Sequence, residues 1–301
     1  MAPHSTMPMC RGFSVFTVAA TDGILRLTPP EARSFVPKRK TLNHLLLLCL
    51  FAVAAYFAPL VACFYLACGL YDVGRNGNLN AGVARQYFLG NGMLTWLLSP
   101  FNALLDLLSL PHCNKGIYRL QDLPAECRGE IQSLIDTAST TDLVGRLEEE
   151  ARQQPRTMIF FKWFGRNVDT SITIPAYQRK FKYVKTIGVS VFRKRASTSR
   201  HFGPLRATLR VLYNLNDMTD DTAFIRVGAV ENHWRENKLF IFDDTLLHQS
   251  FNGSDQARYC LFVDVLRPSL VSGLFSLVVS GVRWAMGGFN HIFYKYWAVI
   301  K

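Results

Sequence analysis

Six short runs rich in β-branched and aromatic residues occupy the second half of this 301-residue chain. They cover residues 158–164, 184–192, 207–215, 223–230, 238–244 and 258–266. Turn-like stretches such as LNDMTDDT and FNGSDQ separate them, without intervening helices. Closely spaced short strands of this kind predict a mainly β domain, either a barrel or a double-sheet jelly roll. Charged residues at helical spacing in 119–152 predict flanking surface helices.

Three apolar segments lie outside this β region. Residues 42–71 carry no charged side chain and exceed the roughly 20 residues that cross a bilayer, so we expect a tilted span kinked at Pro59 or a re-entrant hairpin. Residues 93–110 contain Pro100, Asn102 and Asp106, which favours an interfacial helix. Residues 269–301 combine apolar, aromatic and basic side chains and predict an amphipathic, membrane-associated helix.

These patterns divide the chain into five expected parts. They are a loose basic tail (1–41), a membrane segment (42–71), a connector with an interfacial helix (72–118), a catalytic domain (119–268) and a membrane-associated tail (269–301). We therefore expect an integral membrane protein, of a bacterial inner membrane or a eukaryotic endomembrane. The side that the catalytic domain faces stays open, because it depends on whether 42–71 crosses once or folds back.

The formal net charge of +12 indicates an anionic partner. A membrane surface fits better than nucleic acid, because the chain has apolar segments of membrane length and no nucleic-acid-binding signature. The seven cysteines are odd in number and include no CxxC pair, which argues against a disulfide framework and against a zinc site.

Two histidines, His201 and His248, are followed by Arg258. Two imidazoles can hold an iron ion and leave coordination positions open, and a guanidinium can bind the distal carboxylate of an oxo-acid. These are the groups that an Fe(II) oxygenase with an oxo-acid cosubstrate requires. An acid two residues after the first histidine usually supplies a third ligand, but Gly203 stands there.

The residues around this trio resemble the aspartyl/asparaginyl β-hydroxylase family of Fe(II)/2-oxoglutarate dioxygenases over roughly 158–268. The similar elements are His201-Phe202-Gly203-Pro204, Leu209-Arg210, Trp234, Phe242-Asp243-Asp244-Thr245, Asn252, Val263-Asp264-Val265 and Arg267-Pro268. The apolar front end and the amphipathic tail are also similar to the branch of that family that hydroxylates lipid A acyl chains.

The resemblance implies a double-stranded β-helix and a set of site residues. His201 and His248 would bind iron, Arg258 and Ser190 would hold the distal carboxylate of 2-oxoglutarate, and Arg210 would hold its other carboxylate. Fe(II), 2-oxoglutarate and O2 are the implied cofactors. Asp244 is a candidate to orient a water in place of the missing acid, or else a turn or helix-cap residue.

Two departures bear on this interpretation. Gly203 is shared with the aspartyl/asparaginyl hydroxylases proper, so it favours a two-histidine site. Leu212 stands where the family usually has a histidine that contacts the cosubstrate.

The sequence therefore predicts a membrane-anchored hydroxylase, with a lipid acyl chain slightly favoured as the substrate over an aspartyl or asparaginyl side chain. A non-catalytic membrane binding module is the alternative that Leu212 supports. The oligomeric state stays open.

Overall fold

The computed structural model of the chain describes residues 49, 51–53, 55–77, 80–112, 115–150, 156–286 and 298–300. All of them lie in one compact unit, residues 46–301. The predicted basic tail, 1–41, lies outside the described residues, as does most of the sequence after Met286.

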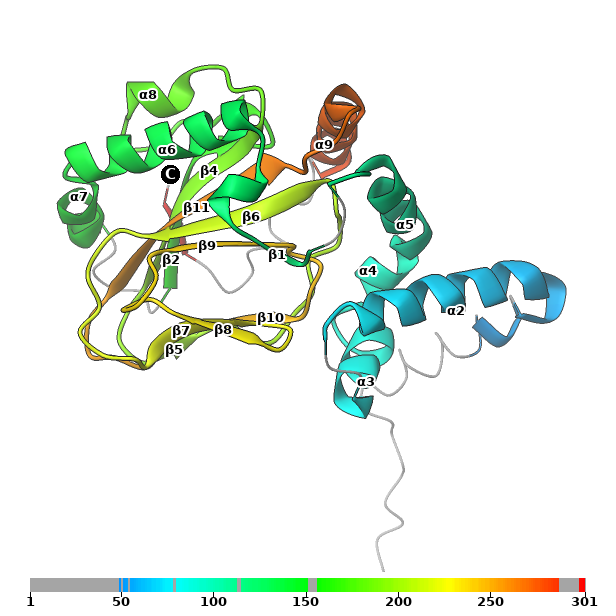
Figure 1. Cartoon of the computed structure of the whole chain (residues 1–301). Helices are drawn as coiled ribbons and strands as arrows, with labels where there is room; N and C mark the ends of the chain where they lie inside the picture. The colour runs from blue at the N-terminus through cyan, green and yellow to red at the C-terminus, as the bar shows by residue number, and fades with distance from the viewer. Residues whose placement is uncertain are drawn as a thin grey trace, which may run out of the picture. The chain divides into compact units, whose positions relative to one another are not determined.

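Two β-sheets form the centre of this unit (Figure 1). The large sheet has the order β1-β9-β6-β11-β4-β2-β12, and β3 pairs with β2. Its strands are β1 (Ile117–Tyr118), β2 (Arg156–Trp163), β3 (Arg166–Asn167), β4 (Val184–Phe192), β6 (Thr208–Asn214), β9 (Leu239–Phe242), β11 (Arg258–Leu266) and β12 (Ala298–Ile300). The small sheet has the order β5-β10-β7-β8, with β5 (Ala196–Ser197), β7 (Ala223–Val227), β8 (Val230–His233) and β10 (His248–Asn252).

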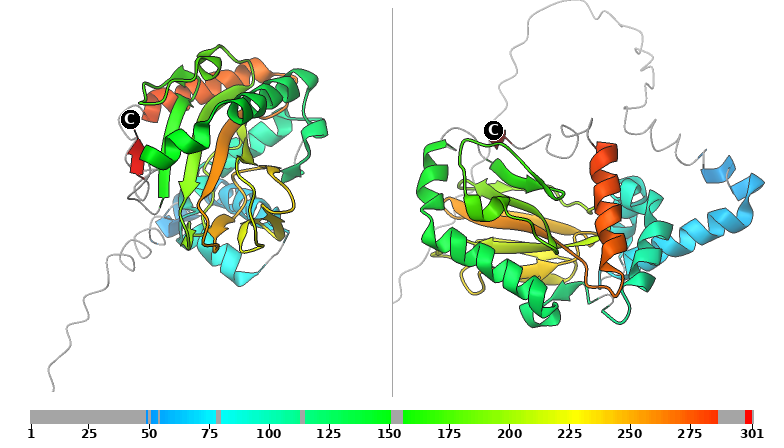
Figure 2. Two further views of the ribbon diagram at one scale, coloured as in Figure 1. Left: turned by 90° about the vertical axis from the view of Figure 1, so that its left-hand side faces the viewer. Right: turned by 90° about the horizontal axis from the view of Figure 1, so that it is seen from above.

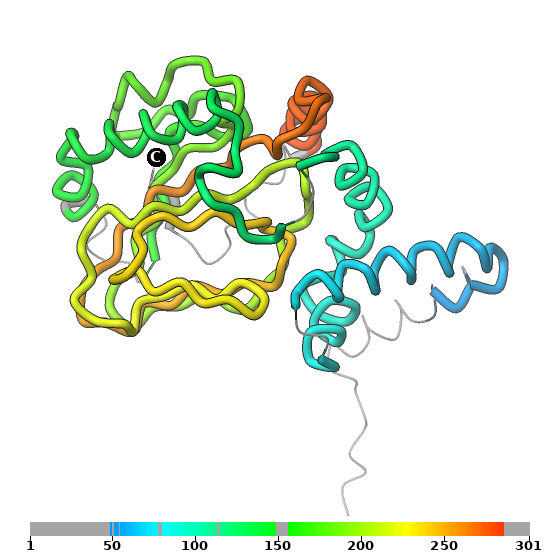
Figure 3. The backbone as a smooth tube through the Cα atoms, in the orientation of Figure 1, coloured from blue at the N-terminus to red at the C-terminus, as the bar shows by residue number. Residues whose placement is uncertain are grey.

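The chain crosses repeatedly between these sheets (Figure 3). After β4 it enters β5 of the small sheet, returns in β6, crosses to β7 and β8, returns in β9, crosses to β10 and returns in β11. This alternation is typical of a double-sheet jelly roll. The predicted jelly-roll sandwich with flanking helices is confirmed.

Helices cover one face of the large sheet. The helices after β1 are η1 (Leu120–Asp122), α6 (Ala125–Thr140), α7 (Leu143–Glu150), α8 (Pro175–Gln178) and α9 (Ser272–Met286). Figure 2 shows α6 running along this face and β12 at the sheet edge, where it pairs with β2 in parallel. The helix α9 agrees with part of the predicted C-terminal helix, whereas residues 298–300 form a strand.

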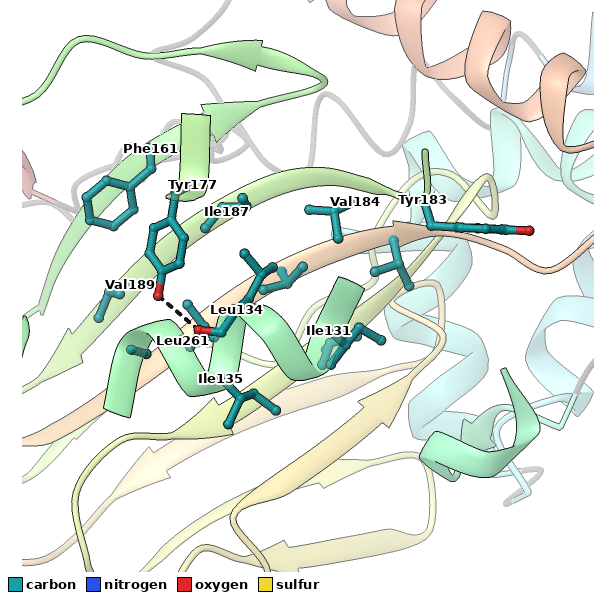
Figure 4. Close-up of a cluster of buried hydrophobic side chains, with 14 of the residues drawn as sticks. Ile131, Leu134, Ile135, Phe161, Tyr177, Tyr183, Val184, Ile187, Val189 and Leu261 are labelled. Atoms are coloured by element: carbon teal, nitrogen blue, oxygen red, sulfur yellow. Dashed lines mark hydrogen bonds between the residues drawn. The ribbon is translucent and has the colours of Figure 1, made fainter. Parts of the chain in front are cut away.

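The alternation of the central strands separates two apolar layers. On β11, Tyr259, Leu261 and Val263 face α6, and Cys260 and Phe262 face the small sheet. In the outer layer, α6 inserts Ile131, Leu134 and Ile135 against β4 and β11 (Figure 4). Tyr177 of α8 donates its hydroxyl to the carbonyl of Leu134 at 3.2 Å, which ties α8 to this layer (Figure 4). The inner layer, between the sheets, is where the candidate site lies.

The helical structure is interrupted at Ala58, next to the predicted kink. The described residues 51–53 and 55–57 are helical, Ala58 is not, and Pro59 begins α2 (Pro59–Gly74), a helix of 16 residues that ends inside the predicted connector. That connector also contains α3 (Ala81–Leu89), and the predicted interfacial helix is divided into α4 (Met93–Leu97) and α5 (Ser99–Leu108). Among the described residues, no helix has the length and apolar character to span a membrane.

Five of the six predicted strands are single strands with ends within two residues of those expected. The sixth, 223–230, ends early at Val227, and a turn at Gly228 leads into β8. The strand β10 was not predicted, because its sequence HQSFN is short and only one of its five residues, Phe251, is apolar.

Candidate active site

The backbone brings the two predicted iron ligands together. His201 and His248 form an antiparallel bridge in which each N–H donates to the other residue's carbonyl, at 3.0 and 2.9 Å. Residues paired in this way place their side chains next to each other on one face. Their ring centroids are accordingly 4.1 Å apart. The sequence-distant pair thus lies at one point of the small sheet.

Both imidazole rings are oriented by backbone carbonyls. The Nδ1 of His201 lies 2.7 Å from the carbonyl oxygen of Ser199, and the Nδ1 of His248 lies 2.8 Å from that of Leu246. A carbonyl oxygen only accepts, so each Nδ1 is the donor, and in a neutral ring this leaves the lone pair on Nε2. Burial, together with the neighbouring His201, lowers the pKa of His248 well below its ordinary value. The neutral imidazole that a metal requires is therefore the stable form of His248.

The carboxylate of Asp244 lies against Gly203. Asp244 Oδ1 is 3.3 Å from His248 Nε2, and it is a buried atom that accepts no hydrogen bond from the described residues. A Cβ at position 203 would lie 2.7 Å from Asp244 Cγ and 2.8 Å from the carbonyl oxygen of Asp244. Glycine is required here because the carboxylate of Asp244 occupies the space that a side chain at 203 would take.

Arg210 pairs with two carboxylates in the structure. Its Nε donates to Asp264 Oδ1 at 2.6 Å and its Nη2 donates to Asp244 Oδ2 at 3.2 Å. Its guanidinium stacks 3.9 Å from the ring centroid of Phe262. Burial raises the pKa of Asp264, although Arg210 opposes that effect. Arg210 thus holds Asp244 beside His248, and its predicted contact with the cosubstrate stays a prediction.

Arg258 is a buried cation on the inner face of β11. Its Nη2 donates to Ser250 Oγ at 2.9 Å, but its Nε and Nη1 are buried and have no hydrogen-bonding partner among the described residues. The rings of Phe192 and Trp234 lie 4.4 and 5.1 Å from its guanidinium carbon. Burial lowers the pKa of this arginine, and the Cys260 thiol opposes that effect.

The remaining predicted residue, Ser190, lies on β4 next to β11. It pairs with Cys260 across the strands, and its buried hydroxyl donates to the Cys260 carbonyl at 3.4 Å. Ser190 and Arg258 share the inner face, since Arg258 lies two residues from Cys260. Leu212 lies on the same face, packed in the inner apolar layer.

Ser250 was missed by sequence reasoning. It lies two residues after His248 on β10, so its side chain points to the same face as the histidine. The alternation would have identified it if β10 had been recognised as a strand.

Among the described residues, no group of three or more His, Cys, Asp or Glu side chains is arranged to hold a metal ion. The candidate metal-binding groups remain His201 and His248, with the Asp244 carboxylate 3.3 Å from His248 Nε2.

A protein-family model described as "Aspartyl/Asparaginyl beta-hydroxylase" matches residues 128–268. That range contains all six predicted site residues. The ornithine lipid ester-linked acyl 2-hydroxylase of Rhizobium tropici is 32% identical over 109 residues, which are 36% of this chain and 37% of that protein. The match thus covers little more than a third of that relative's length.

Solved structures show weak likeness. The protein TT1209 from Thermus thermophilus is 14% identical with a TM-score of 0.25, and the match covers 37% of this chain and 86% of that one. The cupin domain of Cnp3 from Schizosaccharomyces pombe is 13% identical with a TM-score of 0.24, covering 35% and 61%.

Proposed function

Residues 128–268 belong to the aspartyl/asparaginyl β-hydroxylase family, and from this premise we propose that the protein is an Fe(II)/2-oxoglutarate-dependent hydroxylase. The observation that carries the proposal is Arg258. A buried guanidinium with two unsatisfied nitrogens is costly unless an anion joins it, and a carboxylate matches its planar donors.

The residues present fit the iron and the cosubstrate. His201 and His248 offer two Nε2 lone pairs, with each ring held at Nδ1. Asp244 Oδ1 lies 3.3 Å from His248 Nε2 and 3.2 Å from Arg210 Nη1, so this carboxylate would orient a water beside the metal. Arg258, with Ser250 and Ser190, would hold the distal carboxylate of 2-oxoglutarate.

When bound, iron with 2-oxoglutarate and O2 supplies the oxidant that inserts one oxygen into an unactivated C–H bond. The chain's own residues fix the two imidazoles, bind the cosubstrate carboxylates and exclude water from the inner layer. Apolar side chains do the last of these: Leu212, Trp234, Phe240, Phe242 and Phe262 lie buried in that layer. A dry surrounding strengthens the pairing of Arg258 with a carboxylate.

We propose a lipid acyl chain as the substrate. The matched Rhizobium relative is named for acyl 2-hydroxylation of a lipid. On α2, Leu60 is 85% exposed and Phe64 is 56% exposed, and α9 exposes Leu277 and Trp284. Exposed apolar patches of this kind mark contact surfaces. A groove of about 450 Å³ between α2 and α5 is lined almost wholly by apolar side chains, including Phe64, Ala67, Ala103, Leu107 and Leu110. These features favour work at a membrane surface.

Anaerobic titration with Fe(II) and 2-oxoglutarate tests the proposal. We expect a metal-to-ligand charge-transfer band in the wild type and none in His201→Ala or His248→Ala. His233→Ala is the matched control, because His233 also has its Nδ1 2.8 Å from a backbone carbonyl, that of Asp221, but lies away from the pair on β8. A wild type without the band would leave the non-catalytic binding module as the better hypothesis.

Mass spectrometry of lipids and proteins from cells with and without the chain identifies the substrate class. A gain of one oxygen on acyl chains supports the lipid proposal. The same gain confined to aspartyl or asparaginyl residues would replace it with the peptidyl alternative.

A further inference from the structure

The segment that carries His201 accepts hydrogen bonds from side chains that lie outside the two sheets. Gln86 of α3 and Asn91 donate their amides to the carbonyl of Arg200, at 2.9 and 2.5 Å. Thr95 of α4 donates its hydroxyl to the carbonyl of Gly203 at 3.0 Å. The backbone of residues 200–203 is thus bonded to helices on both sides of the histidine.

Asn102 of α5 continues this contact. Its amide donates to the carbonyl of Pro204 at 3.0 Å, and its Oδ1 accepts from the N–H of Arg206 at 2.9 Å. Asn102 has no exposed surface. An amide that both donates and accepts fixes the segment more closely than either bond alone.

Arg75 and Asn76, the two residues directly after Gly74 of α2, hydrogen-bond to the segment that carries His248. Asn76 accepts from the N–H of Leu247 at 2.7 Å. Arg75 donates to Thr245 Oγ1 at 3.1 Å and to Asp243 Oδ2 at 2.5 Å. The N-terminal helices therefore contact both histidine segments.

An apolar cluster connects the two sets of hydrogen bonds. It contains Phe202 and Leu247, which are the chain neighbours of His201 and His248, packed with Val73, Val83 and Tyr87 from α2 and α3. Successive side chains in extended backbone point to opposite faces. Packing Phe202 and Leu247 into the helices therefore turns both histidine rings the other way, and the His248 ring lies 5.3 Å from the ring of Phe242 in the inner layer.

We infer that α2–α5, residues 59–108, form a positioning module for the metal site. The module lies entirely outside residues 128–268, the part that matches the hydroxylase family. Its polar side chains set the backbone of both histidine segments, and its apolar side chains set the direction of the rings. The inference rests on the proposed metal-binding function.

The test measures Co(II) affinity of the full chain by calorimetry and the visible spectrum of bound Co(II), which reports coordination geometry. Thr95→Val removes the hydroxyl that donates to the Gly203 carbonyl and keeps the shape of the side chain. Thr95→Ser keeps the hydroxyl. We expect Co(II) affinity to fall about tenfold or more in Thr95→Val, with an altered spectrum, and to recover in Thr95→Ser.

Ser109→Ala is the matched control. It also deletes a buried hydroxyl next to this module, but among the described residues that hydroxyl bonds only to the carbonyl of Leu105 within α5. We expect its Co(II) affinity and spectrum to match those of the wild type. An equal loss in Ser109→Ala would show a general effect of stability and overturn the inference.

A surface variant covers the case in which Thr95→Val does not fold. Gln86→Met combined with Asn91→Leu removes both donors to Arg200 from the exposed side, and we expect Co(II) affinity to fall severalfold. Wild-type affinity and spectrum in this double variant and in Thr95→Val would overturn the inference while leaving the proposed function intact. A wild type that binds no Co(II), or binds it as well after His201→Ala, would overturn both.

Discussion

The buried arginines of this fold differ in whether a carboxylate lies beside them. Arg206 and Arg267 are fully buried and pair with carboxylates: Arg206 with Asp72 and, at 2.7 Å, with Asp106, and Arg267 with Asp243 and, at 3.1 Å, with Asp106. Arg258 is equally buried, but it has no carboxylate partner among the described residues.

The first group is a closed network of charges. Arg75 joins it through Asp243 at 2.5 Å, so three arginines match three aspartates. Burial alone would raise the pKa of Asp243, but Arg267 and Arg75 hold it well below its usual value. Because every arginine of the network contacts a carboxylate, the charges are balanced, which makes such a network structural. It ties α2 and α5 to the jelly roll.

Among the described residues, the neighbours of the Arg258 guanidinium are a serine hydroxyl, the Cys260 thiol and two aromatic rings. Rings soften the cost of burying a cation without neutralising it. Buried arginines that pair with carboxylates therefore stabilise the fold, whereas Arg258, which lacks such a pair, is the one suited to bind an anion.

Arg267→Met provides the largest expected effect. It leaves Asp243 and Asp106 buried with one cation fewer, so we expect the free energy of unfolding to fall by about 3–5 kcal/mol. Denaturant unfolding monitored by circular dichroism measures it. A loss below about 1 kcal/mol would mean that the network is not the structural tie described.

Arg258→Met is the converse test. Removing an unpaired buried cation should leave the free energy of unfolding unchanged or raise it, while 2-oxoglutarate binding weakens by about 100-fold. Calorimetry with the Fe(II)-loaded protein measures the binding. Strong destabilisation with unchanged 2-oxoglutarate affinity would place Arg258 with the structural group.

Gly203→Ala should have an intermediate effect. The new Cβ would displace the Asp244 carboxylate from beside His248, and we expect Co(II) affinity to fall about tenfold. Gly281→Ala is the matched control, because a Cβ added at this position has no neighbouring atom within 4 Å. Unchanged affinity in Gly203→Ala would remove Asp244 from the site.

The pH dependence of stability should be the smallest effect. The pKa of His248 is lowered in the folded state. Below the ordinary pKa near 6.5, the unfolded chain therefore binds a proton at this histidine that the folded protein does not bind. The contribution of His248 is fully present above pH 6.5 and is lost as the pH falls, by at most about 1.4 kcal/mol per unit. Urea midpoints of the metal-free protein between pH 7.5 and 5 should fall less steeply in His248→Gln. Parallel profiles would contradict the assignment.

Much of the fold could be predicted from the sequence, because strand alternation is a local property. The predicted runs at 184–192 and 258–266 coincide with β4 and β11, and the jelly roll followed from their spacing. The sequence did not show which side chains of the helices before residue 112 are buried. Tyr87, Thr95 and Asn102 are buried against the histidine segments, which lie far along the chain.

The sequence by itself determined the double-sheet fold and the chemistry available at His201 and His248, and its resemblance to a known family associated Ser190, Arg210 and Arg258 with them. Side-chain alternation and residue type carry that information locally. Only the tertiary structure decided that the two histidines share one backbone bridge and that the Asp244 carboxylate fills the space next to Gly203. It also decided that Arg258, of the three buried arginines in the described part of the chain, is the one without a carboxylate partner. Those facts depend on contacts between segments far apart in the chain, and local pattern does not record which distant charges meet.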